Sequence, residues 1–127
     1  MIKNISLITD QIKDFSLQNI EFIDRFYLNY QNGSFEGTCF LDIDFMIKDQ
    51  EKQYHACFRF YNPNHIDFES LGTIHQLSIE IYDIRDRGWE NKIYEVVDSE
   101  DHSLHFYCTE IEIISFRETP YRLKSYL

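Results

Sequence analysis

Hydrophobic and polar residues alternate along most of the chain after residue 20, which is the spacing of half-buried β-strands. The clearest stretch is TCFLDIDFMI, residues 38–47, in which Asp42 and Asp44 fall between apolar residues of the opposite phase. This pattern predicts that the two carboxylates face water while their apolar neighbours face a core. Further alternating stretches occupy residues 20–30, 53–61, 76–84, 92–97 and 102–116.

Short turn-forming segments separate these stretches. Asn32-Gly33 is a strong hairpin signal, because both residues tolerate positive φ. KDQEK at 48–52 and NPNH at 62–65 also interrupt the alternation. We therefore expect a mainly β fold, either an antiparallel sandwich or a strongly bent sheet, of about six to seven strands.

Both ends of the alternating region are irregular. Within residues 2–18 the apolar residues recur every three or four positions, so a short N-terminal helix and an irregular opening strand would each fit. Within residues 102–116 the apolar phase changes from even positions, such as Phe106, to odd positions, such as Ile111. Either a bulge near Thr109 resets the phase, or the strand crosses from one sheet to another.

The composition indicates one compact domain over residues 1–127, rich in aromatic side chains that can fill a core. The chain has eleven Phe, nine Tyr and one Trp, but only four Gly and two Pro. It lacks an apolar run of about 18 residues and a signal-peptide pattern, so we expect neither a membrane span nor secretion. Three widely spaced cysteines suit reduced thiols, which predicts a cytoplasmic location.

The formal net charge is −10 and is unevenly distributed. Residues 1–64 carry six Lys and Arg against nine Asp and Glu, whereas residues 65–127 carry six against thirteen. A surface this acidic repels phosphate groups, so we expect neither nucleic-acid nor anionic-membrane binding. The charge either keeps the protein soluble or marks a docking face for a basic protein.

The sequence shows no catalytic or metal-binding motif. His55 and Cys57 share a strand face, but no Cys-x-x-Cys or His-x-x-x-His spacing accompanies them. Asp98, Glu100 and Asp101 crowd one turn without the spacing of an EF-hand loop, which favours a solvated hairpin. A Gly-rich phosphate loop and a nucleophile elbow are also missing. We therefore expect a protein that is not an enzyme and has no metal or cofactor.

The segment DRGWE contains the only tryptophan, Trp89. Gly88 permits a tight loop, and the favoured interpretation is that Trp89 folds back and plugs an open end of the sheet core. The alternative is an exposed interface anchor flanked by Asp86, Arg87 and Glu90, because Trp and Arg are preferred in binding hot spots. Loss of stability in Trp89→Ala would support the first interpretation.

Residues 79–113, IEIYDIRDRGWENKIYEVVDSEDHSLHFYCTEIEI, resemble a pattern shared by small acidic bacterial proteins. The pattern is a strand, an Asp-Arg-Gly-Trp-Glu turn, a Tyr-x-Val-x-Asp-x-Glu hairpin and a Phe-Tyr-Cys-x-x-Ile strand. The preceding ACFRFYNPNHIDF is compatible with it. These proteins are similar in size and charge to immunity proteins of bacterial toxin systems. The resemblance implies toxin neutralisation and transfers no catalytic residue.

The leading hypothesis is a non-enzymatic protein-binding domain that neutralises a basic toxin. Its candidate contact residues are Asp83, Asp86, Arg87, Trp89, Glu90, Glu110 and Glu112. A second hypothesis is a β-sandwich that binds a small ligand or carbohydrate on Tyr and Trp stacking platforms. A third is a homo-oligomer subunit that buries aromatic residues of its outer strand faces.

Overall fold

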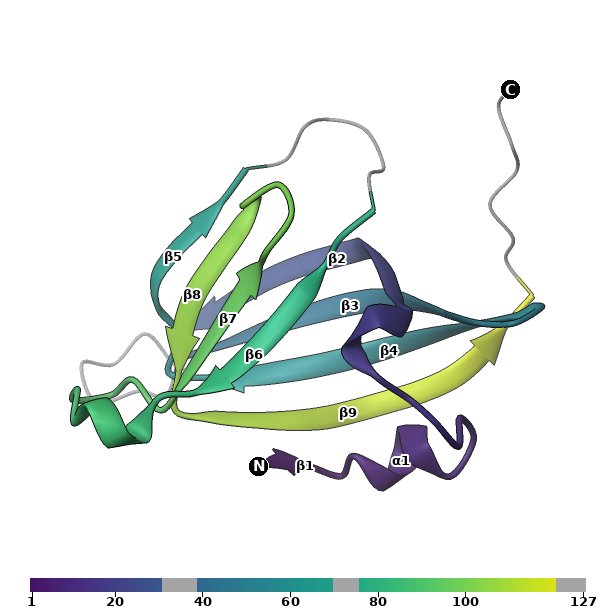
Figure 1. The fold of residues 1–127 in the computed structure, drawn as a ribbon, viewed down its shortest axis with the longest axis horizontal. Coiled ribbons are helices and arrows are strands. Elements are labelled where there is room, and N and C mark those ends of the chain that lie inside the picture. The colour runs from purple at the N-terminus through teal and green to yellow at the C-terminus, as the bar shows by residue number, and fades with distance from the viewer. Residues whose placement is uncertain (31–38, 70–75, 121–127) are drawn as a thin grey trace.

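Two packed β-sheets form the protein in a computed structural model that describes residues 1–30, 39–69 and 76–120 (Figure 1). The mainly β fold expected from the alternation is confirmed. The five-stranded sheet has the order β1 (Ile2–Lys3), β9 (Glu110–Thr119), β4 (Lys52–Tyr61), β3 (Cys39–Asp49), β2 (Ile20–Tyr30). The four-stranded sheet has the order β5 (Asn64–Phe68), β8 (Leu104–Cys108), β7 (Tyr94–Asp98), β6 (Ile79–Asp83).

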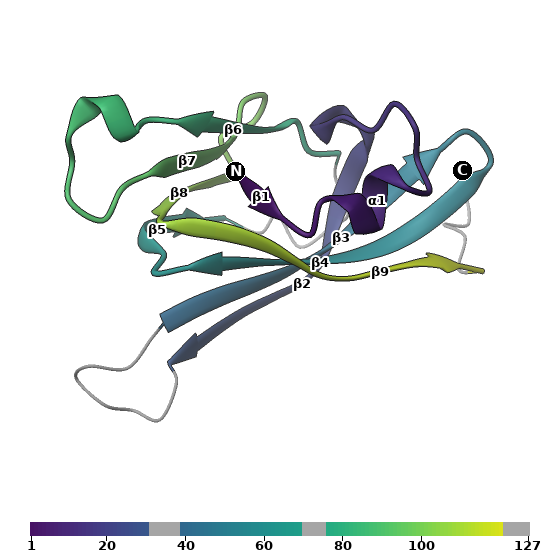
Figure 2. The same cartoon turned by 90° about the horizontal axis from the view of Figure 1, so that it is seen from below.

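In the described part of the chain, three short helical segments accompany the sheets: α1 (Ser6–Thr9) and the 3-10 helices η1 (Leu17–Asn19) and η3 (Arg85–Arg87). The helical spacing near the N-terminus thus corresponds to one helical turn, with Ile8 and Ile12 buried in the core. Figure 2 shows α1 beside the four-stranded sheet, on the same side of the five-stranded sheet. None of the helices in the described segments is long and apolar enough to cross a membrane.

The strands connect mostly through hairpins. β2 pairs with β3 and β3 with β4, both antiparallel; the Asn32-Gly33 turn lies outside the described residues. At Thr109 the chain leaves β8 in one sheet and enters β9 in the other, so the predicted crossing is confirmed. β1 is an exception to the antiparallel pattern, because Ile2 pairs in parallel with Ile111 of β9.

Aromatic side chains join the two sheets in the core. Phe45 and Phe58 meet edge to face at 5.2 Å within the five-stranded sheet, and Phe60 meets Phe106 of β8 at 4.9 Å. All four rings are fully buried. Such contacts contribute about 0.5–1.5 kcal/mol each beyond the burial of apolar area. The inward phase of the alternating strands therefore forms the core, as expected.

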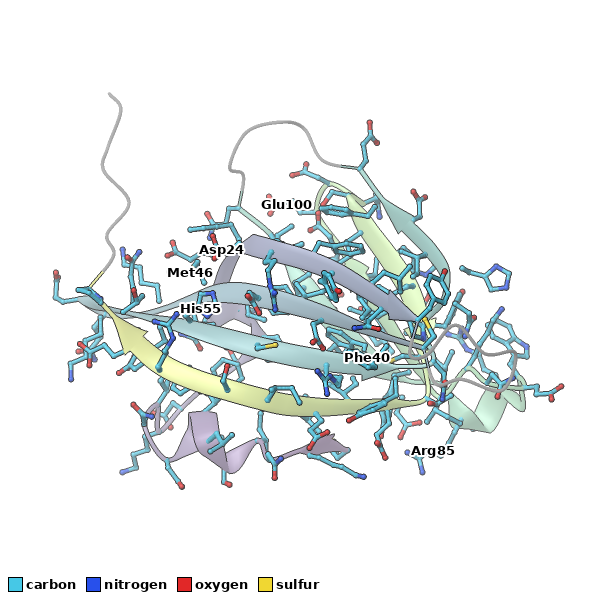
Figure 3. All side chains as sticks on the ribbon, turned by 180° about the vertical axis from the view of Figure 1, so that it is seen from behind. Asp24, Phe40, Met46, His55, Arg85 and Glu100 are labelled. Carbon is cyan, nitrogen blue, oxygen red and sulfur yellow. The ribbon has the colours of Figure 1, made fainter. Side chains whose placement is uncertain are left out.

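Asp42 and Asp44 correct the expectation that both face water. They lie on the outer face of the five-stranded sheet, the face seen in Figure 3, yet each is only 6% exposed. Arg59 on β4 is 2.9 Å from Asp42, and Arg25 on β2 is 2.9 Å from Asp44. Burial is tolerated because each carboxylate has a charged partner on a neighbouring strand.

Candidate functional site

A well-defined loop joins β6 to β7 and places Trp89 on the surface. The backbone N–H of Ile84 donates to the carbonyl of Ile93 at 2.8 Å and closes the base of the loop. Ile84 is buried, which fixes this base to the core. After η3 the chain turns at Gly88, whose φ of 69° lies in the left-handed region that glycine adopts readily.

The expectation that Trp89 plugs the core is wrong. Its side chain is 46% exposed, and its ring packs edge to face against Tyr107, with ring centroids 6.0 Å apart. Tyr107 occupies the outer phase of β8, between the buried Phe106 and Cys108. The turn at Gly88 therefore directs the indole onto the outer face of the four-stranded sheet instead of into the core.

Two cations cover the exposed rings. The guanidinium carbon of Arg87 lies 5.2 Å from the Trp89 ring centroid, and Lys92 Nζ lies 5.3 Å from it. Lys92 Nζ also lies 4.6 Å from the centroid of Tyr107. Each exposed cation–π contact contributes about 0.5–1 kcal/mol. Together they hold the indole in one orientation at the surface.

Glu95 connects this group to β7. His105 Nε2 lies 2.8 Å from one carboxylate oxygen of Glu95, and Arg87 lies 3.9 Å from the other. Glu95 also pairs directly with Tyr107 across the β7–β8 ladder. We call this group the Trp89 cluster; its members are Arg87, Trp89, Lys92, Glu95, His105 and Tyr107.

A polar cavity of about 660 Å³ adjoins the cluster. It is lined by Cys39, Asn62, Pro63, Asn64, His65, Glu90, Asn91 and Lys92. The Asn64 amide nitrogen donates to the carbonyl of Asn91 at 2.9 Å, whereas its buried Oδ1 has no hydrogen-bond partner among the described residues. The cavity lining thus carries charged groups of both signs, Glu90 and Lys92, next to the Trp89 cluster.

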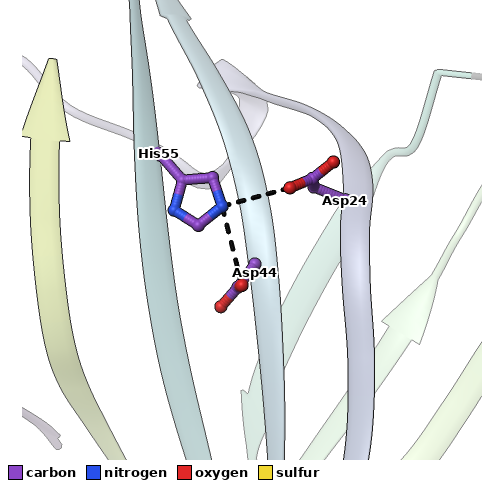
Figure 4. A group of neighbouring side chains, drawn as sticks. All are labelled: Asp24, Asp44 and His55. Atoms are coloured by element: carbon purple, nitrogen blue, oxygen red, sulfur yellow. Dashed lines mark hydrogen bonds and ion pairs between the residues drawn. The ribbon is translucent and has the colours of Figure 1, made fainter. Parts of the chain in front are cut away.

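Three possible metal ligands meet elsewhere, on the outer face of the five-stranded sheet. Asp24, Asp44 and His55 come from three adjacent strands, and their ligand atoms lie within 4.8 Å of one another (Figure 4). His55 Nε2 is 3.2 Å from Asp24 and 3.5 Å from Asp44. Because the oxygen of Asp44 that faces His55 also pairs with Arg25, a cation is already present. An ion-pair network across β2, β3 and β4 accounts for this group.

The two buried thiols are poor nucleophiles. Burial raises the pKa of Cys108 to about 12, and burial together with a hydrogen bond to Asp44 raises the pKa of Cys57 to about 12. The thiolate, which is the reactive form, is therefore scarce at neutral pH. Although Cys57 and His55 share a face of β4, this cysteine is not activated for nucleophilic catalysis.

A family model described as Immunity protein PIM8 matches residues 8–114, a segment that includes the complete Trp89 cluster. The chain belongs to the PIM8 immunity protein family. Immunity proteins typically bind and neutralise toxins and are generally non-enzymatic, so membership implies a toxin protein as partner. No curated protein and no solved structure matches the chain.

For this PIM8 family member, the structure separates the seven contact residues predicted from the sequence into two groups. The first group lies at the end of β6 and in the following loop: Asp83, Asp86, Arg87, Trp89 and Glu90. The second group, Glu110 and Glu112, lies on β9 in the other sheet. Glu110 pairs with Lys3 at 2.8 Å, and Glu112 accepts a hydrogen bond of 2.6 Å from Tyr61. Glu110 and Glu112 therefore serve contacts within the five-stranded sheet and its N-terminal strand, and of the predicted residues Arg87 is the one that contacts the indole in the described structure.

Sequence reasoning missed four members of the Trp89 cluster: Lys92, Glu95, His105 and Tyr107. The alternation of β7 and β8 did contain a signal, because three of them occupy the outward phase of their strands. What the sequence lacks is the register that pairs Glu95 with Tyr107 and the loop geometry that brings Trp89 over them. This surface of the PIM8 family member depends on tertiary pairing.

Proposed function

We propose that the protein neutralises a toxin by binding it directly, with the Trp89 cluster at the centre of the contact. The observation that carries this proposal is an exposed indole held by Arg87, Lys92 and Tyr107. Trp, Tyr and Arg are the residue types that most often dominate protein interfaces. Because the cluster is already ordered, binding loses less side-chain entropy than it would with a mobile tryptophan.

The charge around the cluster favours a basic toxin. The segments that form the four-stranded sheet and its connections, residues 64–69 and 76–108, carry ten Asp and Glu against three Lys and Arg. Asp83, Asp86 and Glu90 are exposed at the end of β6 and in the loop that carries Trp89. Such a field accelerates encounter with a positively charged surface and opposes acidic competitors.

The contacts of the rings favour a protein partner over a carbohydrate. A sugar stacks on an aromatic face that is free, but Arg87 and Lys92 already lie over Trp89, and Lys92 lies over Tyr107. A protein surface can instead use the indole edge, the cations and the surrounding carboxylates together. The polar cavity beside Glu90 would accept one protruding basic or amide side chain.

Toxin protection in cells, followed by affinity measurement with the purified pair, tests the proposal. The candidate toxin is the protein encoded beside this gene, expressed with and without the chain. We expect Trp89→Ala to abolish protection and to weaken binding about 30-fold, the size of a hot-spot loss of about 2 kcal/mol. Its free energy of unfolding should fall by about 1–2 kcal/mol through loss of the two cation–π contacts, less than the roughly 3–5 kcal/mol expected for a core tryptophan.

Tyr27→Ala is the matched control. Tyr27 is 49% exposed, close to the 46% of Trp89, but it lies on the outer face of the five-stranded sheet, opposite Asp42. We expect this variant to keep both protection and affinity. If Trp89→Ala bound the toxin as tightly as the wild type, or if both variants lost the same affinity, the Trp89 cluster would not be part of the interface.

A further inference from the structure

Among the described residues, no strand pairs with the backbone edge of β6 that faces away from β7. In the described part of the chain β6 has a single strand neighbour, β7. Two hydrogen bonds bracket this ladder: Ser99 N–H to the carbonyl of Ser78 at 2.9 Å, and Ile84 N–H to the carbonyl of Ile93 at 2.8 Å. Backbone groups in an antiparallel strand alternate between its two sides. The even-numbered residues therefore face β7, and the odd-numbered ones face outward.

The outward-facing backbone groups belong to Ile79, Ile81 and Asp83. Leu77 is the preceding position with an outward-facing backbone. Its N–H donates a hydrogen bond to the carbonyl of Glu21, at the start of β2, at 2.8 Å. That pairing does not continue along β6. A row of unpaired donors and acceptors is a template for another strand.

A groove of about 450 Å³ runs beside this edge. It is lined by Ser16, Leu17, Gln18, Ser78, Ile79, Glu80, Ile81 and Tyr82. Five consecutive residues of one wall come from β6 and the residue before it, so the groove follows the strand. The 3-10 helix η1 forms the other wall and leaves space beside the edge.

We propose that an extended segment of the toxin pairs with the free edge of β6 and adds a fifth strand to the four-stranded sheet. This inference rests on the proposed function, because it names where and how the toxin backbone is held. Strand addition obtains affinity from main-chain hydrogen bonds and selectivity from alternate side chains. The edge lies on the same strand that leads into the Trp89 loop, so one partner can contact both.

The two faces of β6 specify the side chains of the added strand. On the inner side, its residues would lie beside Ile79 and Ile81, which together with Leu17 make that side apolar. On the outer side they would lie beside Glu80 and Tyr82, whose side chains are hydrogen-bonded to each other. The toxin segment should therefore alternate apolar and basic residues.

Charge disfavours a second copy of this chain as the occupant. Pairing of two β6 edges would place the Glu80 and Asp83 carboxylates of both copies along one new ladder, and each chain already has a net charge of −10. Like charges on adjacent strands are destabilising. A basic strand replaces this repulsion with attraction.

Amide hydrogen exchange measured by NMR tests the edge without requiring the toxin. The probe is a peptide of about ten residues that alternates lysine and valine, a common strand length. The control peptide carries glutamate in place of lysine. We expect the amides of Ile79, Ile81 and Asp83 to exchange about tenfold more slowly with the lysine peptide, whereas those of Glu80 and Tyr82 are already protected in the free protein.

Three results would overturn the inference. The first is unchanged exchange at the three amides with a large excess of the lysine peptide. The second is equal slowing by the glutamate peptide, which would rule out charge recognition. The third is protection of these amides in the free protein together with a dimeric mass in sedimentation, which would make a second copy the occupant.

The same measurement with the toxin separates this inference from the proposed function. Toxin binding that slows exchange in the Trp89 loop but not at the three β6 amides disproves strand addition and leaves the proposed function standing. A neighbouring toxin that does not bind, combined with protection by the lysine peptide, contradicts the proposed function and leaves a strand-binding edge. Ile81→Pro removes one outward donor but no bond to β7, so it should weaken toxin binding. Urea unfolding of this variant checks that its fold is retained.

Discussion

Arg59 donates two parallel hydrogen bonds to the carboxylate of Asp42, from Nε to Oδ1 and from Nη2 to Oδ2, each 2.9 Å long. The ring of Phe40 lies 4.0 Å from the guanidinium carbon and covers its face. This arrangement explains how a carboxylate that is only 6% exposed is accommodated on the outer face of a sheet.

Removing Arg59 should therefore destabilise the fold. In Arg59→Met the Asp42 carboxylate stays buried without its partner, and we expect the free energy of unfolding to fall by about 2–3 kcal/mol. Urea denaturation monitored by circular dichroism measures the change. Arg59→Lys keeps the charge but not the bidentate geometry, so the free energy of unfolding should fall by less than in Arg59→Met. A loss below about 0.5 kcal/mol in Arg59→Met would show that the pair contributes little to stability.

Asp98 should be a second stability determinant. The carboxylate is fully buried and accepts hydrogen bonds from Ser78 N–H at 3.0 Å and from the Ser103 hydroxyl at 2.7 Å. The N–H groups of Glu100 and Ser103 also donate to it. Asp98→Asn should lower the free energy of unfolding by about 2 kcal/mol. Asp101→Asn, at an exposed position of the same turn, should change it by less than about 0.5 kcal/mol.

The effect of Asp98 should depend on pH. Burial alone would raise its pKa, but the hydrogen bonds from Ser103, Ser78 and Glu100 outweigh burial and lower the pKa below the usual value. A lowered folded-state pKa means that the stabilisation is complete above the unfolded-state pKa of about 4 and is lost as the pH falls through the folded-state value. The difference in free energy of unfolding between the wild type and Asp98→Asn should become smaller below about pH 4. If this difference in free energy stayed constant from pH 7 to pH 3, the hydrogen bonds to the Asp98 carboxylate would not be the source of the stabilisation.

Cys57 and Cys108 should resist thiol reagents. Both have a pKa raised to about 12, mainly by burial, so neither forms much thiolate at pH 8. In a Cys39→Ser variant, which leaves only these two thiols, we expect labelling by a disulfide reagent to be about 100-fold slower in the folded protein than in urea. Rapid labelling of the folded variant would show that one of the two is accessible and activated.

The sequence predicted those parts of the fold that depend on strand period. The change of apolar phase between Phe106 and Ile111 marked the crossing between sheets, because one strand cannot keep both residues on the same side of a single pleat. The hairpin between β2 and β3 was likewise expected from Asn32-Gly33, and the pairing of its strands is observed. Period and turn chemistry are local properties, so a single sequence contains them.

The sequence could not predict what neighbouring strands bring together. Asp42 and Asp44 have the period of solvent-facing residues, and their burial follows from arginines on the adjacent strands. Asp98 was expected in a solvated hairpin, but its donors include Ser78, 20 residues earlier in the chain. Trp89 was favoured as a core plug because tryptophan is large and apolar, yet Tyr107 and two cations hold it outside. Each of these errors concerns a partner distant in sequence.

Salt should lower the rate at which the protein associates with its toxin and should have less effect on the rate at which the complex dissociates. The acidic segments of the four-stranded sheet attract a basic surface over a range of about one Debye length, roughly 10 Å at 0.1 M salt. We expect the association rate, measured by stopped-flow emission of Trp89, to fall at least about tenfold between low and high salt, with little change in dissociation. Asp86→Asn should slow association in the same way, whereas Asp10→Asn, at an exposed position beside α1, should not. Salt-independent association would refute steering by this face and leave the indole contacts as the source of recognition.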